Sequence, residues 1–274
     1  MTQSLVELMT VEPAEVEDTF VGQAEPYGAL GIYGGHFVGQ ALAAGLATVE
    51  APKLAHSLHC YFLRPGDPEV PIHYVVERLR EGRGSDVRSI VALQHGRKAF
   101  QMTASFKLAE AGDEHQPDMP AVEDPDVLLA EAGDSNFSPP PTKDGRMQMV
   151  LGSEHFVQPE FVPDREPELK VWARCPSDRT LTEREAQVVL AFLSDGTLMF
   201  NSVIPHGLPF QTHRLTSIDH AAWFHRPADV TEWMLFDQYS SAAADGRGMN
   251  HGVLYDRSGR LLMTMAQESL LRRI

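Results

Sequence analysis

Cysteine is scarce in this sequence, and its two copies are far apart. The 274 residues contain only Cys60 and Cys175. Two widely separated cysteines cannot build the disulfide framework of a small secreted domain or a cysteine zinc cluster. We therefore expect two free thiols, as is usual in a reducing compartment.

Long hydrophobic runs and targeting signals are also lacking. No stretch approaches the roughly 18 uninterrupted apolar residues that a membrane helix requires. The first residues, Met1–Glu7, carry neither a basic nor an apolar segment, and the last four, Leu271–Ile274, differ from the peroxisomal Ser-Lys-Leu tripeptide. These features favour a cytoplasmic protein without a membrane partner.

Basic residues are outnumbered by acidic ones. There are 23 Lys and Arg against 38 Asp and Glu, which gives a net charge of −15 at pH 7. Such a chain is repelled by the phosphate backbone, so no nucleic-acid partner is expected. An anionic ligand would need a local basic patch.

Two common catalytic motifs are absent. No serine stands in the Gly-x-Ser-x-Gly elbow of serine hydrolases, and the His-Glu-x-x-His pattern of zinc hydrolases is missing. His56 and His59, three residues apart on a predicted strand, are expected to point to opposite faces. We therefore expect no metal site and no cofactor.

What the sequence does contain is enough apolar material, 43% of residues, for one large core or two smaller ones. An acidic segment punctuated by prolines runs from about Leu108 to Pro141 and separates two halves of comparable size. We predict three parts: an N-terminal domain at 1–108, a connector at 109–146 and a C-terminal domain at 147–274.

The two halves repeat one another. An aromatic-Phe-x-Arg-Pro-x-Asp motif occurs in both, 162 positions apart, and Arg-Gly and Gly-Arg pairs follow at separations of 164 and 163. The copies stand at Tyr61–Asp67 and Trp223–Asp229, at Arg83-Gly84 and Arg247-Gly248, and at Gly96-Arg97 and Gly259-Arg260. Because the three pairs of motifs are separated by nearly the same number of positions, they predict a duplicated unit.

Each half is predicted to place one long helix before a run of antiparallel strands. In the first half, apolar residues recur with helical spacing from Val38 to Val49, and most others are Ala or Gly, which fits a helix packed closely against a sheet. In the second half, Thr182–Glu185 has the sequence of a capping box, and Asp195-Gly196 should end the helix. Strand-like runs follow at Ile72–Glu77, Ala99–Phe106, Trp233–Tyr239 and Leu261–Glu268.

Three segments carry a resemblance to a known family. Gly34–Gln40, His56–Asp67 and Ile218–Pro227 resemble segments of the type II acyl-CoA thioesterases, and the resemblance spans nearly the whole chain outside the connector. It implies an α+β fold, the double hotdog, in which two tandem antiparallel sheets are each wrapped around a long helix. It also implies a role in lipid metabolism, namely hydrolysis of an acyl-CoA to CoA and a free carboxylic acid without a cofactor. Association into a homo-oligomer, a dimer or tetramer, is implied as well.

The resemblance also implies the catalytic residues. In that family a water is oriented and activated by an Asp, a Thr and a Gln of the second hotdog, and by motif these fall on Asp195, Ser217 and Gln267. Ser217 keeps the hydroxyl of the family's Thr but lacks the methyl that stiffens χ1. We expect hydrolysis to survive this change, with looser positioning.

The first copy of the repeat lacks these residues. Matching the helix ends aligns Asp195 with Thr48, and the strand separations align the other two with about Ala55 and Ala104. The first copy is therefore expected to supply a wall of the substrate pocket and the second copy the chemistry.

The residue types suit hydrolysis by water. Asp195 is the candidate general base, and its place at a helix C-terminus disfavours the ionised carboxylate. Ser217 and Gln267 can hold a water and polarise a carbonyl through hydrogen bonds.

Substrate contacts are hypothesised from two further features. Glycines at the start of the first helix allow close backbone approach, so the amide of Gly35 or His36 is the candidate donor to the thioester oxygen. Arg64, Arg226 and Arg247 are cations available for the nucleotide end of CoA. The first two also have a structural interpretation, because Arg-Pro-x-Asp occurs in both halves, so Arg247 is retained as a substrate-binding candidate.

Three alternatives stay open. A hotdog enoyl-thioester hydratase generally has a His five residues after its Asp, but Phe200 stands there after Asp195. A non-catalytic acyl-CoA binding protein would not need Asp195 and Gln267. A hydrolase of an unusual acyl group cannot be separated from the leading interpretation by composition, and the sequence does not give the acyl chain length.

Overall fold

The chain divides into two compact units. The computed structural model describes residues 3–27, 31–132, 145–152, 161 and 165–274. The first unit holds Met1–Glu114, Arg179–Gly196 and Ala221–Ala228, and the second holds His115–Asp178, Thr197–His220 and Asp229–Ile274. Each unit therefore combines segments that are far apart in sequence, whereas the predicted boundaries at 1–108, 109–146 and 147–274 follow chain order. Those boundaries stay a prediction.

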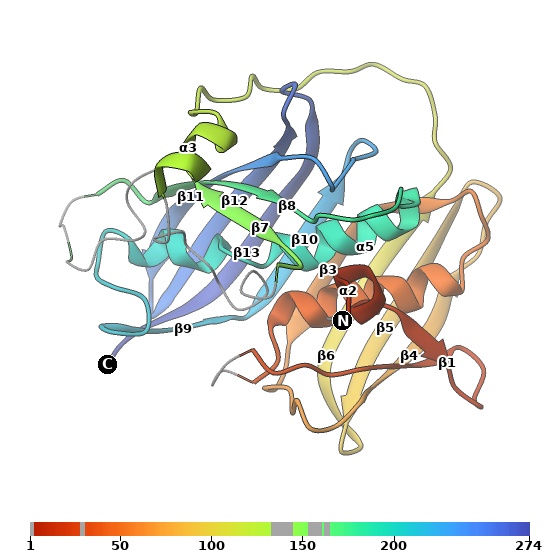
Figure 1. Cartoon of the computed structure of the whole chain (residues 1–274). Coiled ribbons are helices and arrows are strands. Elements are labelled where there is room, and N and C mark those ends of the chain that lie inside the picture. The colour runs from red at the N-terminus through yellow and green to blue at the C-terminus, as the bar shows by residue number, and fades with distance from the viewer. Residues whose placement is uncertain (1–2, 28–30, 133–144, 153–160, 162–164) are drawn as a thin grey trace. The chain divides into compact units, whose positions relative to one another are not determined.

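The first unit is an antiparallel sheet with helices (Figure 1). Its sheet order is β1-β2-β4-β5-β6-β3, and every neighbouring pair is antiparallel. The elements are α1 Leu5–Leu8, β1 Val11–Pro13, β2 Thr19–Gly22, α2 Gly34–Ala47, β3 Leu54–Phe62, β4 Ile72–Arg80, β5 Ser85–Gln94, β6 Arg97–Lys107 and α5 Glu183–Ser194.

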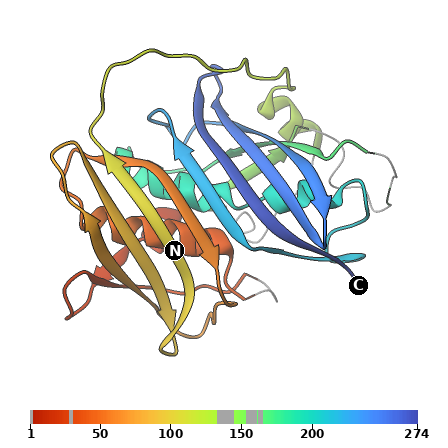
Figure 2. The ribbon, with the colours of Figure 1, turned by 180° about the vertical axis from the view of Figure 1, so that it is seen from behind.

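The second unit repeats this order. Its sheet runs β7-β8-β11-β12-β13, with β9 pairing β13, and each of these pairs is antiparallel. The elements are α3 Pro125–Ala132, β7 Gln148–Leu151, β8 Glu168–Arg174, the 3₁₀-helix η3 Leu198–Val203, β9 His213–Ser217, β11 Met234–Ala244, β12 Arg247–Asp256 and β13 Leu261–Arg273. Strand β10, Asp219–Phe224, contributes residues to both units. Seen from behind, the blue strands β12 and β13 lie side by side, as do β5 and β6 (Figure 2).

Strand register confirms the predicted duplication. Ala55 pairs with Phe106 in the first unit, and Ser217 pairs with Ser269 in the second, so the same pairing recurs at separations of 162 and 163. The structure adds two strands before each helix, β1 and β2 in one copy and β7 and β8 in the other. Three of them, β1, β2 and β7, have only three or four residues, which is too short for periodicity to reveal.

Helix α2 is buried on nearly every side because its residues are small. It packs on β3, β4, β5 and β6 and also on α5. A Cβ at Gly45 would lie 3.1 Å from the ring of Phe106, and one at Gly39 would lie 3.3 Å from Cβ of Phe192. Glycines thus let sheet and helix approach from opposite sides, as the Ala- and Gly-rich sequence predicts.

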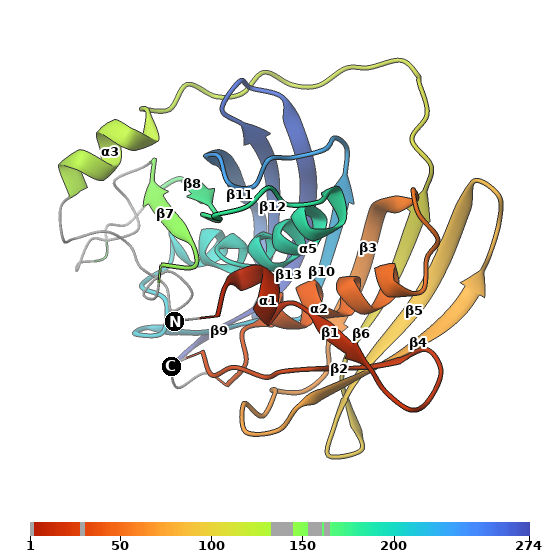
Figure 3. The same cartoon turned by 45° about the vertical axis from the view of Figure 1, so that its right-hand side comes forward.

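A buried glutamine ties the N-terminal segment to α2, beside which α1, β1 and β2 lie (Figure 3). Nε2 of Gln40 donates to the carbonyls of Leu8, at 2.7 Å, and Gln23, at 3.0 Å, and its Oε1 accepts from the hydroxyl of Tyr74 at 3.0 Å. All polar atoms of this amide are therefore used inside the protein.

The capping box of α5 and its predicted stop at Asp195-Gly196 are both confirmed, and a second helical segment follows the stop. Thr182 and Glu185 cap each other's backbone, and α5 ends at Ser194 with Asp195 as its C-cap. The chain then resumes as η3. Among the described residues, only the span Glu183–Val203 is long and apolar enough to cross a membrane. Of its apolar stretch of 18 residues, 83% is buried in the fold, as in the core helix of a globular protein.

This continuation corrects one alignment of the repeat. Thr48 contacts Arg88 of β5, and the residue matching Arg88 in β12, Asn250, contacts Ser202 of η3. Thr48 therefore corresponds to Ser202 and not to Asp195. Matching by helix ends was wrong, because the second helix is interrupted at Asp195.

The connector is more ordered than its composition predicts. Met119, Val122, Leu128 and Leu129 pack against a buried cluster of the second unit made by Val150, Trp172, Trp233 and Leu235. The indole of Trp172 donates to the carbonyl of Glu123 at 3.0 Å, and that of Trp233 donates to Asp126 at 3.1 Å. Residues 115–132 therefore belong to the fold of this unit. Residues 133–144 of the predicted connector lie outside the described part.

Candidate active site

The carboxylate of Asp195 lies between two helix ends within the first unit. Its residue caps the C-terminus of α5 and is 4% exposed. A Cβ added to Gly34, the first residue of α2, would overlap Oδ2 of Asp195 and lie 3.2 Å from its Cγ. The carboxylate therefore occupies space that a glycine leaves open at the start of α2.

These helix ends act on Asp195 in opposite directions. The C-terminus of α5 disfavours a negative charge, and the N-terminus of α2 stabilises one. The sequence predicted only the first effect. The N-terminus of α2 is close to Asp195 because of the packing between α2 and α5, which no local pattern reveals.

Two tyrosines, Tyr27 and Tyr33, lie near this carboxylate. Tyr27 stacks on Tyr33 with ring centroids 5.0 Å apart, and Tyr33 meets Phe192 edge-on at 4.9 Å. The hydroxyl of Tyr33 donates to the carbonyl of Phe192 at 2.9 Å. Burial, together with the charge of Asp195, raises the pKa of both tyrosines. Both phenols therefore remain protonated and wall the carboxylate with apolar ring surface.

The start of α2 distinguishes the two candidate amides. The amide of His36 donates to the carbonyl of Tyr33 at 3.1 Å, and its imidazole lies 2.8 Å from the carbonyl of Gln23. Within the described residues, no acceptor is found for the amide of Gly35. A Cβ at Gly35 would overlap the carbonyl of Phe192 and the ring of Tyr33, so glycine is required there by packing as well.

Ser217 and Gln267 lie on one face of the second unit's sheet. Ser217 ends β9 and pairs with Ser269 of β13, two residues after Gln267. Alternation along a strand places Gln267, Ser269 and the partner Ser217 on the same face. Gln267 is fully buried, so it faces inward and not toward solvent.

Buried polar side chains lie next to Gln267. Its Nε2 lies 3.4 Å from Nδ1 of His220, and its backbone carbonyl accepts from Nδ2 of Asn250 at 3.2 Å. Asn250 also donates to Oγ of Ser269 at 3.1 Å and accepts from the amide of Ser202 at 3.1 Å. Burial lowers the pKa of His220 to about 3, so its imidazole is neutral at pH 7.

The structure thus places Ser217 and Gln267 on one face of the sheet in the second unit and Asp195 beside Gly34 in the first. Sequence reasoning missed His220 and Asn250 as neighbours of Gln267. The pairing of Asn250 with Gln267 across two hairpin strands was the available signal, because buried amides in neighbouring strands meet on one face.

The candidate arginines are all engaged with protein groups. Arg247 lies 3.2 Å from Glu268 and 3.4 Å from Asp245 and is half-exposed. Arg226 pairs with Glu114 at 3.0 Å, and Arg64 donates to the carbonyl of Lys98. Arg247 therefore sits in a mixed-charge patch at the start of β12. Across the described ranges, no group of three or more His, Cys, Asp or Glu side chains is placed to hold a metal ion.

Known proteins match the chain over most of its length. Residues 23–107 match the model of the acyl-CoA thioesterase N-terminal domain, and residues 113–271 match that of the C-terminal domain. Acyl-coenzyme A thioesterase 8 of Homo sapiens is 34% identical, with 97% of this chain and 88% of the human protein covered. Acyl-CoA thioesterase 2 of Haemophilus influenzae is 32% identical, with 98% and 97% covered.

Solved structures support the same family assignment and show the fold. The crystal structure of an acyl-CoA thioesterase II from Mycobacterium marinum superposes with a TM-score of 0.81 at 31% identity, covering 97% of both chains. A protein with a hotdog fold from Alicyclobacillus acidocaldarius gives a TM-score of 0.81 at 19% identity, with 99% of both chains covered, which supports the fold alone. The chain therefore belongs to the acyl-CoA thioesterase family, has its double-hotdog fold, and hydrolyses acyl-CoA thioesters.

Proposed function

We propose that this enzyme hydrolyses acyl-CoA by direct attack of a water that Asp195 activates. The observation that carries the proposal is the buried carboxylate of Asp195 beside Gly34 at the N-terminus of α2. A base in a water-poor, aromatic surrounding next to backbone amides has the two components that thioester hydrolysis needs.

The proposed reaction has two steps. Asp195 takes a proton from the water as its oxygen bonds to the thioester carbon, and the amide of Gly35 stabilises the oxyanion. The carbon–sulfur bond then breaks, the carbonyl re-forms, and the proton on Asp195 passes to the leaving sulfur. The products are free CoA and a carboxylic acid. The bond between the His36 amide and Tyr33 favours Gly35 over His36 as the donor.

Ser217 and Gln267 are proposed to orient the water. Both present hydrogen-bonding groups on the same sheet face, and Gln267 is held by buried neighbours. Removing the hydroxyl in Ser217→Ala should lower kcat about 3–10-fold, the effect of one ordinary hydrogen bond.

Arg247 is proposed to contact a phosphate of CoA. Its acidic neighbours Asp245 and Glu268 hold the guanidinium in place while nearly half of the side chain stays exposed. We also propose a cytoplasmic location, supported by two buried free thiols, Cys60 and Cys175, and assembly into a homo-oligomer. Cell fractionation and light scattering of the purified protein test these two points.

A thiol-release assay over acetyl- to palmitoyl-CoA tests the base directly. Asp195→Asn keeps the shape of the side chain and removes its basicity, so kcat should fall roughly 10²–10⁴-fold while the protein stays folded. The same assay reports the acyl chain preference. A folded Asp195→Asn variant with wild-type kcat would contradict the proposal. Acyl-CoA binding without turnover by the wild type would favour the non-catalytic alternative.

A further inference from the structure

A buried histidine contacts the side-chain amide of Gln267. Nδ1 of His220 lies 3.4 Å from Nε2 of Gln267, and the two residues are 1% and 0% exposed. His220 belongs to β10, whose start is fixed beside Gln267. The amide of Glu268 donates to Oδ1 of Asp219 at 2.8 Å, and its carbonyl accepts from the amide of Ile218 at 2.9 Å.

The backbone of Gln267 is held from the other side. Asn250, its cross-strand partner, donates to its carbonyl at 3.2 Å and also accepts from the amide of Ser202 in η3. The contact with His220 restricts rotation of the side-chain amide as well.

The chemistry of the two groups determines which one donates the hydrogen bond and which one accepts it. The amide nitrogen of Gln267 can only donate, so Nδ1 of His220 must accept. A neutral imidazole with its proton on Nε2 offers an acceptor at Nδ1, and burial keeps the ring neutral because it lowers the pKa to about 3. The Oε1 end of the Gln267 amide is then turned away from His220.

We propose that His220 is a positioning residue that fixes which end of the Gln267 amide orients the attacking water. This inference rests on the proposed role of Gln267. His220 acts on the reaction through Gln267, so removing its Nδ1 acceptor lowers kcat and leaves the substrate KM nearly unchanged.

Three variants of His220 separate this role from packing. The side-chain oxygen of Asn lies near the place of Nδ1, whereas the terminal amide of Gln lies near the place of Nε2. We expect kcat of His220→Asn to stay within about 3-fold of wild type, and kcat of His220→Gln and His220→Leu to fall about 10-fold with KM unchanged within 2-fold. His213, a buried histidine of β9, provides a matched control, since His213→Asn should leave kcat unchanged.

A double-mutant cycle links the effect to Gln267. In a Gln267→Ala background, His220→Leu should lower kcat no further, because the amide that it orients is gone. If His220→Leu does not fold, the comparison of kcat between His220→Asn and His220→Gln still tests the proposal. Equal kcat for His220→Asn and His220→Gln, or an unchanged effect of His220→Leu in the Gln267→Ala background, would overturn the proposal. Full activity of Gln267→Ala would refute both this inference and the proposed role of Gln267. An inactive Gln267→Ala, together with wild-type kcat for all His220 variants, would refute the inference alone.

Discussion

At the scale of single residues, the site depends on groups whose local sequence looks ordinary. Asp195-Gly196 alone has the sequence of a helix stop, and the structure confirms that α5 ends there. The role proposed for Asp195 depends on the glycine at the start of another helix, Gly34, which leaves room for its carboxylate. The family resemblance identified Asp195 as a candidate, whereas the proximity of Gly34 to its carboxylate is visible only in the folded chain.

Gly34→Ala tests this close approach. The added methyl would overlap Oδ2 of Asp195, so the carboxylate must move, and a shift of about 1 Å in a catalytic group lowers the rate up to about 100-fold. We expect kcat in the thiol-release assay to fall about 10–100-fold. Gly84→Ala is the control, because a Cβ there meets no atom within 4 Å. A folded Gly34→Ala enzyme with kcat equal to that of the control would show that Asp195 needs no such space.

The residues that sequence reasoning missed share one property. His220 and Asn250 are polar, buried and far from Gln267 along the chain, so their contacts depend on strand register. Nothing in a single strand marks His220 as a neighbour of Gln267. Register is a property of paired strands, which explains why these residues could not be assigned beforehand.

At the scale of elements, local signals were sufficient where the element is defined by its own residues. The capping box at Thr182 sets the start of α5, and the small residues of α2 account for its burial. The order of residues 115–132 was not predictable from composition, because it comes from packing against Trp172 and Trp233. Acidic, proline-rich segments usually form linkers when no such apolar surface covers them.

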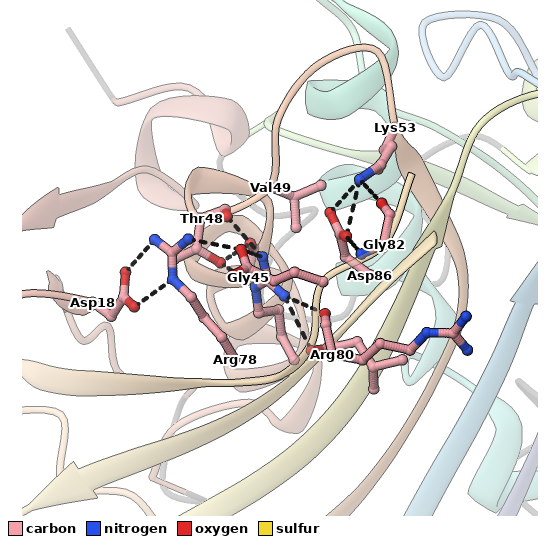
Figure 4. A network of polar contacts seen from close by, with 12 residues as sticks. Asp18, Gly45, Thr48, Val49, Lys53, Arg78, Arg80, Gly82 and Asp86 are labelled. Carbon is pink, nitrogen blue, oxygen red and sulfur yellow. Dashed lines mark hydrogen bonds and ion pairs between the residues drawn. The ribbon is translucent and has the colours of Figure 1, made fainter. Parts of the chain in front are cut away.

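A buried ion pair joins the segment after α2 to β5 in the first unit, and Figure 4 shows its members Lys53, Gly82 and Asp86. Nζ of Lys53 donates to both oxygens of Asp86, at 2.9 and 2.8 Å, and to the carbonyl of Gly82 at 2.7 Å. Burial raises the pKa of Asp86, but the hydrogen bonds from Lys53 and from the amide of Gly82 outweigh it and lower the pKa overall. The carboxylate is therefore stable in the interior only with its partner.

Lys53→Met should leave that charge uncompensated. We expect the free energy of unfolding, measured by urea titration, to fall by about 3–5 kcal/mol. Lys107→Met provides the control, because its pair with Glu110 is exposed and should contribute less than about 1 kcal/mol. Equal losses for the two variants would show that the Lys53–Asp86 pair contributes no more than a surface pair.

At the scale of the whole molecule, one strand order is used twice, yet the two copies diverge in chemistry. Ala104 and Gln267 stand at matching positions of β6 and β13, and Arg88 and Asn250 at matching positions of β5 and β12. The first copy places a fully buried arginine, bonded to Thr48, where the second places the amide that holds Gln267. The sequence repeat predicted the shared architecture and the alanines that the first copy has in place of Ser217 and Gln267, but not the arginine in place of Asn250.

Acid should destabilise the folded protein through His220. Its folded pKa of about 3 lies below the ordinary value of 6.5, so the unfolded state binds the proton more tightly. The stability present above pH 6.5 is therefore lost as the pH falls toward 3. Between pH 7.5 and 5 this amounts to about 2 kcal/mol. Urea titrations should show His220→Asn losing less stability over this interval than wild type by about that amount, and parallel losses would contradict the burial of a neutral imidazole.

In the proposed mechanism, water and not a protein carboxylate attacks the thioester. A single turnover in H₂¹⁸O with enzyme in excess over acyl-CoA tests it, with mass spectrometry of both the released acid and the peptide that contains Asp195. Direct attack predicts one ¹⁸O in the acid, unlabelled Asp195, and no acyl adduct on the quenched protein. An acyl adduct, or ¹⁸O in the carboxylate of Asp195, would contradict the account and make Asp195 a nucleophile instead of a base.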